Sequence, residues 1–258
     1  MNFIVNILLI TGGMLVAMMA FLEIGRRVGV RRLAQNPEIR NGVSTLEGAV
    51  LALLGLIIAF TFSGAMSRFD GRRQLVVEES NDIGTAYLRV DLLPSASQPA
   101  VRELFRQYLD SRLETYRLVP DMVAVNKELA RSAKIQGEIW QQSIAASRLP
   151  DAHPDAAKLL LPALNAMIDI TTTRTMASKM HPPRIIFILL FVMALASSLL
   201  AGHAMAEGKG RTWIHMLCFS LAMAAAIYVV LDIEYPRLGF IRVDDIDQVM
   251  VDLRNSMK

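Results

Sequence analysis

The chain has 258 residues, of which 53% are hydrophobic and 20% charged, and its formal net charge is +3. A mean hydropathy of +0.37 is too high for an ordinary water-soluble domain. The arginines gather beside apolar runs and form no continuous basic face, which argues against nucleic-acid binding. The single cysteine, Cys218, excludes an internal disulfide framework and a cysteine-based metal site.

Four stretches of the chain are long and apolar enough to cross a membrane. Roughly 20 helical residues span the hydrocarbon core, and a helix satisfies its own backbone polar groups inside lipid. The predicted spans are residues 3–22, 48–67, 185–206 and 212–231. The first lacks the basic start and the cleavage pattern of a secretory signal, so we interpret it as a retained anchor.

The segments that join these spans differ in length. Residues 23–47 are predicted to form a short basic loop, and residues 207–211 are short enough to make spans three and four an antiparallel hairpin. Between spans two and three lies a nearly neutral insert whose apolar residues recur at helical spacing. The predicted organisation is therefore two spans in 1–67, a soluble helical domain in 68–183, two spans in 184–235 and a tail in 236–258.

The insert is predicted to contain four helices. The apolar stripe of the second span continues past Arg68 with no proline before Pro94, so one long helix leaves the membrane. Further helices are predicted from Val101 to near Pro120, from Val125 to Ile144, and from Asp155 onward, the last kinked at Pro162. The fold class is all-α: a four-span transmembrane helical protein with a helical soluble insert between spans two and three.

Three passages carry a resemblance to a known family: residues 59–63 (AFTFS), 72–94 (RRQLVVEESNDIGTAYLRVDLLP) and 232–243 (DIEYPRLGFIRV). Together they resemble the bacterial bestrophin-like family over the whole four-span layout. Bestrophins are pentameric anion or cation channels in which a signature Arg-aromatic-x-acid-x-Arg follows the second span. The matching residues 68–73 (RFDGRR) carry the acid one position early, and Val76 stands where a tryptophan often follows.

The resemblance implies a homo-oligomer, and by analogy a pentamer, in the bacterial inner (plasma) membrane. Its partners would be the lipid bilayer and an inorganic ion, with no nucleic acid and no cofactor. In bestrophins apolar side chains one turn apart on the second span build a constriction, and those positions fall on Ala52, Leu56 and Phe60. Five copies of this face could form a hydrophobic gate that closes by dewetting. The alternative is that these residues face lipid or another helix.

Charged residues that follow the second span have two interpretations each. Arg68, Arg72 and Arg73 are candidates for a pore mouth that concentrates anions, although snorkelling at the headgroups is the interpretation we favour. Glu78, Glu79 and Asp82 are weak candidates for a calcium site, and a solvated helix face is favoured for them. No metal site is therefore predicted. Small residues of the second span that allow close helix packing are Gly48, Ala52, Gly55 and Ala59.

The chain shows no nucleophile–base pair, glycine-rich phosphate loop or paired catalytic carboxylates, so we do not expect an enzyme. The predicted function is a bestrophin-like oligomeric ion channel or pore. The alternative is a non-conducting scaffold or signalling adaptor whose soluble helices bind a partner. Orientation stays open, because Arg26, Arg27, Arg31, Arg32 and Arg40 would place the first loop in the cytoplasm, whereas the bestrophin layout places the insert there. The permeant ion, regulator and subunit number also stay open.

Overall fold

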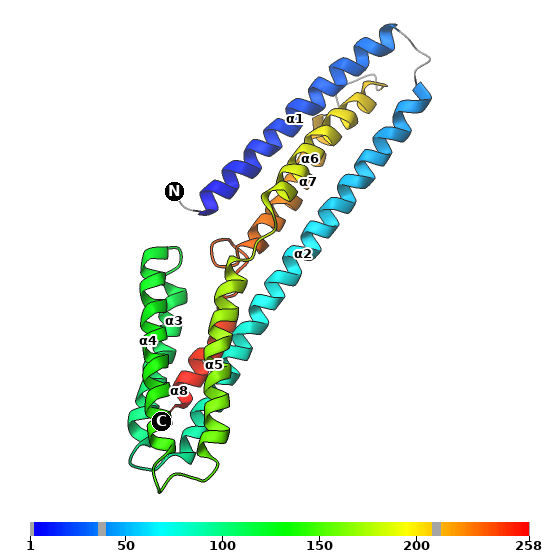
Figure 1. Cartoon of the computed structure of the whole chain (residues 1–258). Coiled ribbons are helices and arrows are strands. Elements are labelled where there is room, and N and C mark those ends of the chain that lie inside the picture. Colours follow the sequence, from blue (N-terminus) through cyan, green and yellow to red (C-terminus); the bar gives the residue numbers. More distant parts are fainter. Residues whose placement is uncertain (1–2, 36–39, 208–212, 258) are drawn as a thin grey trace. The chain divides into compact units, whose positions relative to one another are not determined.

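The computed structural model describes residues 3–35, 40–207 and 213–257, and this part of the chain contains helices and turns but no strand (Figure 1). The all-α prediction is confirmed. The α-helices are α1 (Phe3–Gln35), α2 (Arg40–Arg89), α3 (Gln98–Arg117), α4 (Met122–Ser147), α5 (Ala156–Lys179), α6 (Arg184–Ala204), α7 (Trp213–Glu234) and α8 (Gln248–Ser256). Short 3-10 helices are η2 (Val90–Leu92), η3 (Met205–Glu207) and η4 (Asp244–Asp247).

By length and composition, four helical stretches could cross a membrane: Phe3–Arg32, Thr45–Leu92, Ala156–Ala204 and Trp213–Glu234. Each contains one of the predicted spans, with two small differences at their ends. The third predicted span runs to residue 206, two residues beyond Ala204. The fourth predicted span begins at residue 212, which lies outside the described residues. The number of spans is therefore confirmed, while the limits of the membrane-embedded parts stay predictions.

The predicted loop at residues 23–47 is wrong, because α1 continues to Gln35 and α2 already begins at Arg40. The charged residues that suggested a loop in fact support the helix. Glu23 accepts hydrogen bonds from Arg26 Nε at 3.1 Å and from Arg27 Nε at 2.8 Å, the spacings at which opposite charges stabilise a helix. Helix α1 is described as far as Gln35, and the Asn36–Pro37 dipeptide follows it in the sequence.

The chain folds as two compact units. One, here called the span unit, contains Met1–Ser67 and His181–Ile241, and the other, the insert unit, contains Arg68–Met180 and Arg242–Lys258. In the span unit α1, α6 and α7 run side by side (Figure 1). The core of that unit joins α1, α2, α6 and α7 through Met14, Met18, Leu54, Leu190, Ala194 and Ile227.

Glycines set the distance between α1 and α6. A Cβ at Gly25 of α1 would overlap the carbonyl oxygen of Leu199, and a Cβ at Gly202 of α6 would overlap the carbonyl oxygen of Leu22. The two backbones are therefore in direct contact, as small residues allow between membrane helices. By contrast, a Cβ at Gly48 or Gly55 of α2 would meet nothing within 4 Å, so the predicted small-residue stripe is not used by the described part of the chain.

The insert unit has its own core, built from the second part of α2 together with α3, α4, α5 and α8. The predicted long helix is confirmed, since α2 is continuous to Arg89. Helix α4 begins after Asp121, whose side chain accepts hydrogen bonds from the backbone N–H groups of Val123 and Ala124. Met250 of α8 and Met257 are buried in this core. The end of the chain is thus part of the insert unit.

Candidate functional site

The predicted pore-lining residues lie on an exposed face of α2. This helix packs into the span unit through Leu54 and Ala65, both fully buried. At about 100° per residue, Ala52, Leu56 and Phe60 fall on the opposite side, and Leu56 and Phe60 are 51% and 68% exposed. The three residues therefore share one apolar face that no other described helix of the span unit covers.

The three arginines that follow this face are not equivalent. Arg72 donates hydrogen bonds to the carbonyl oxygens of Ala177 and Met180, at 3.1 and 2.8 Å. These carbonyls belong to the end of α5, where helical carbonyl groups lack partners within the helix. Arg73 is exposed and lies 3.7 Å from Asp70 on its own helix, and Arg68 is half-buried. Arg72 thus caps the C-terminal end of α5, whereas the side chain of Arg73 is accessible to solvent or ions.

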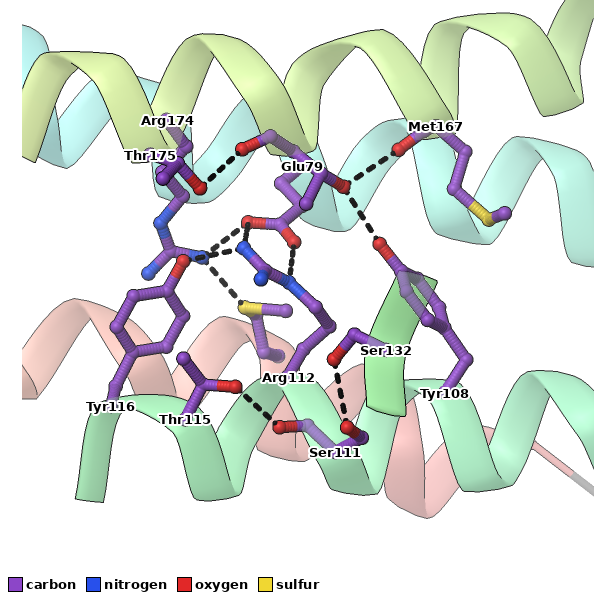
Figure 2. Close-up of polar contacts among 12 residues, drawn as sticks. Glu79, Tyr108, Ser111, Arg112, Thr115, Tyr116, Ser132, Met167, Arg174 and Thr175 are labelled. Atoms are coloured by element: carbon purple, nitrogen blue, oxygen red, sulfur yellow. Dashed lines mark hydrogen bonds and ion pairs between the residues drawn. The ribbon is translucent and has the colours of Figure 1, made fainter. Parts of the chain in front are cut away.

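The three acidic residues of α2 do not form one cluster. Glu78 is exposed, Asp82 is half-buried and Glu79 is fully buried. The carboxylate oxygens of Glu79 accept hydrogen bonds from Arg112 and Arg174, so they are already occupied (Figure 2). Among the described residues, no three His, Cys, Asp or Glu side chains come together in a way that could hold a metal ion.

The contacts of Glu79 form a buried ion-pair network that ties four elements together. Arg112 of α3 reaches Glu79 Oε1 with its Nε at 2.5 Å and donates to the hydroxyl of Tyr116. Arg174 of α5 lies over the ring of Tyr116, 3.8 Å from its centre. Arg174 also donates to Asp247 of η4 at 3.3 Å. Figure 2 shows Glu79 between Arg112 and Arg174. With Asp247 as the second carboxylate, two guanidinium groups are balanced by two carboxylates, which joins α2, α3, α5 and η4.

Electrostatics keep the Glu79 carboxylate ionised. Burial acts to raise the pKa of Glu79, but attraction to Arg112 and Arg174 and their hydrogen bonds outweigh it, so the pKa lies below its ordinary value of 4.5. Glu79 lies on the polar part of α2 that follows Ser67, outside the predicted span. The role of Glu79 is therefore structural, since both of its carboxylate oxygens accept hydrogen bonds from arginine side chains of the protein.

Sequence reasoning missed Arg112, Tyr116 and Arg174 as partners of Glu79. A signal was present in α3, where Tyr108, Arg112 and Tyr116 follow one another at four-residue spacing along one face of the helix. A cation on an apolar helix face is costly unless an opposite charge meets it. The pattern therefore required a buried acid from another helix, but did not say which one.

The passage after α7, which contributed to the family resemblance, forms a tight turn around Asp232. The buried carboxylate accepts hydrogen bonds from the backbone N–H of Phe240 at 3.0 Å and of Ile241 at 2.7 Å. A Cβ at Gly239 would overlap the Asp232 carboxylate, so a larger residue there would displace this side chain from its hydrogen bonds. Nearby, the buried Glu234 lies 3.0 Å from Nδ1 of His181, at the start of the span unit's second segment.

We expect Asp232→Asn to loosen this turn. An amide retains a single acceptor oxygen and brings two donors against backbone N–H groups, so hydrogen bonds to a charged acceptor, worth about 1.5–3 kcal/mol each, are weakened or lost. The melting temperature in mild detergent should fall, and proteolysis within residues 235–243 should become faster. Asp245→Asn, at an exposed carboxylate, is the control, and an equal effect of both changes would contradict this role for Asp232.

Two solved structures are similar to this chain, both of a bacterial bestrophin homologue from Klebsiella pneumoniae carrying a mutation. One has a TM-score of 0.68 at 11% identity and covers 93% of this chain and 98% of that chain. The other has a TM-score of 0.64 at 12% identity and covers 94% and 97%. At such identities the likeness concerns the fold.

No curated protein matches the chain. The model of a protein family described as the Bestrophin-like domain, however, matches residues 7–246. This match extends from the first span through the turn around Asp232 to η4, and thus includes the exposed face of α2 and the Glu79 network. The chain is a membrane protein that belongs to the Bestrophin-like family.

Proposed function

We propose that the protein is an oligomeric ion channel or pore of the bacterial inner membrane. The observation that carries the proposal is the apolar face of α2, with Leu56 and Phe60 exposed opposite the buried Leu54. An apolar face of this kind needs a cover of lipid or protein. A closed ring of subunits with α2 innermost provides one, and the family match and the fold likeness to a bestrophin homologue support such a ring.

In this ring Ala52, Leu56 and Phe60 form the constriction. Side chains four residues apart on a helix repeat along the pore axis at about 6 Å per step, so successive rings of apolar groups line one narrow passage. Narrow apolar rings gate by excluding water, without any charged group. Arg68 and Arg73, which follow on α2, place positive charge near one mouth of the passage and attract anions there.

The experiment is ion flux into vesicles that contain the reconstituted protein. Replacing both Leu56 and Phe60 with alanine should widen and wet the constriction and raise flux severalfold. The matched control is Leu217→Ala with Leu221→Ala, two exposed side chains of α7 that also lie four residues apart. These changes should leave flux unchanged, because apolar volume that faces lipid controls no passage.

Assembly must be measured in the same samples, by native mass in mild detergent. An intact ring whose flux does not respond to the α2 changes would remove Leu56 and Phe60 from the pore. A wild-type protein that is a monomer or simple dimer, with flux equal to that of empty vesicles, would overturn the channel and favour a non-conducting adaptor.

A further inference from the structure

Helix α1 is longer than a membrane span requires. Its charge-free stretch ends at Leu22, and about 20 residues suffice to cross the hydrocarbon core. The remaining turns, from Glu23 to Gln35, continue as regular helix in the same direction. If the span occupies residues 3–22, these turns pass through the headgroup layer of one leaflet.

The two sides of this extension differ in character. One side packs on α6 and η3 through Gly25 and Gly29. The other side is exposed and carries, within one strip of the helix surface, Ile24, Arg27, Val28 and Arg31. Apolar and guanidinium side chains therefore alternate on a face that no other described residue covers.

The charge of this extension is strongly positive. Its only carboxylate, Glu23, is paired with Arg26 and Arg27. Arg31 and Arg32 are exposed, and neither forms an ion pair with any described residue. At a membrane surface an exposed guanidinium group binds the phosphate of a lipid headgroup, because its planar donors fit two phosphate oxygens at once. This includes Arg27, whose side chain is 62% exposed and whose contact with Glu23 is made through its Nε.

The spacing of Arg27 and Arg31 allows both guanidinium groups to bind the same phosphate. The two residues are four positions apart, so they lie on the same side about 6 Å from each other along the axis. Helical side chains lean toward the N-terminus, which here is the direction of the apolar span. Ile24 lies between the arginines and the span, nearest the acyl region, and Val28 lies beside Arg27.

We propose that this face of α1 binds the headgroup of an anionic phospholipid of the membrane that the helix crosses, with Arg27 and Arg31 on the phosphate and Ile24 on the adjoining acyl region. The lipid would anchor the end of α1 at a fixed depth. This role is independent of ion conduction, so it can be tested without any flux measurement.

The test compares bilayer nanodiscs of phosphatidylcholine alone with nanodiscs that contain phosphatidylglycerol of the same acyl chains. Wild-type protein should melt several degrees higher with phosphatidylglycerol and should retain that lipid in native mass spectra. The variant with Arg27 and Arg31 changed to glutamine should lose both effects. The control variant has Arg117 and Arg131 of the insert unit changed to glutamine, both exposed, and should keep both.

Results of several kinds would overturn the proposal. The first is a wild-type protein that does not distinguish the two lipids, and the second is a glutamine variant that keeps the preference. The third is an equal rise in melting temperature with soluble glycerol phosphate, which would point to a free anion. A change of oligomer mass without a change in lipid retention would assign the face to a subunit contact instead. Should the double variant not fold, Arg31→Gln alone is expected to weaken the preference partially, and an unchanged preference would count against the site.

Discussion

Replacing Gly25 by leucine is expected to destabilise the span unit severely. A Cβ at this position would overlap the carbonyl oxygen of Leu199, and the opposing Gly202 has the same relation to the carbonyl oxygen of Leu22. The clashing atoms belong to backbones, so they cannot rotate away as a flexible side chain would. Overpacking of a well-packed site typically costs about 1–3 kcal/mol, and we expect at least the upper end of that range because α1 and α6 would have to separate.

The matched control lies in the same helix. A Cβ at Gly13 would meet nothing within 4 Å, so Gly13→Leu should leave stability unchanged or raise it slightly through better helix propensity. Both variants should be compared by thermal unfolding in mild detergent and by size-exclusion chromatography. Gly202→Leu should reproduce the loss seen with Gly25→Leu. Equal melting temperatures for the Gly13 and Gly25 variants would contradict the close approach of the two helices.

Most of the fold could be predicted because it depends on local signals. Charge-free runs mark the spans, and the absence of a proline between Arg68 and Pro94 accounts for the uninterrupted α2. The extension of α1 does not follow from hydropathy, because a charged residue marks the end of an apolar run and not the end of a helix. Arg26 and Arg27 instead pair with Glu23 one turn earlier, and charge of this kind ends a membrane span without ending the helix that contains it.

The candidate site also contains one part that can be predicted from the sequence and one part that cannot. The shared face of Leu56 and Phe60 follows from four-residue spacing alone, and the structure leaves that face exposed. The partners of Glu79 did not follow, since Arg112 and Arg174 are 33 and 95 residues away in sequence. Periodicity identifies which face of a helix is buried, but it does not identify which other helix packs against that face.

Glu79→Gln is expected to destabilise the insert unit by about 3–5 kcal/mol, the usual cost of leaving a buried charge without its partner. Glutamine keeps the size of the side chain but places a neutral amide between Arg112 and Arg174. Arg112 is fully buried and its Nη1 already lacks a hydrogen-bond partner among the described residues. The hydroxyl of Tyr116 accepts a hydrogen bond from Arg112, but a neutral hydroxyl cannot balance the charge of the guanidinium group.

Glu78→Gln is the matched control, since it makes the same chemical change at the adjacent, exposed position. Surface substitutions of this kind usually alter stability by less than about 0.5 kcal/mol. Denaturant unfolding followed by circular dichroism in detergent should separate the two variants clearly at neutral pH. Equal unfolding free energies for both variants would show that the Glu79 network does not stabilise the insert unit.

The difference in stability between the wild-type protein and Glu79→Gln should change with pH in a defined direction. The two guanidinium groups hold the pKa of Glu79 below its ordinary value of 4.5 in the folded protein. The folded state therefore binds fewer protons at this site than the unfolded chain does, and the stabilisation is fully present above about pH 4.5 and declines as the pH falls through the folded pKa. Wild-type protein should lose stability in that acidic range more steeply than Glu79→Gln, so the gap between them should narrow. A gap that stays constant down to the lowest pH at which both proteins fold would mean that lost shape or packing, rather than lost charge, explains the defect of Glu79→Gln.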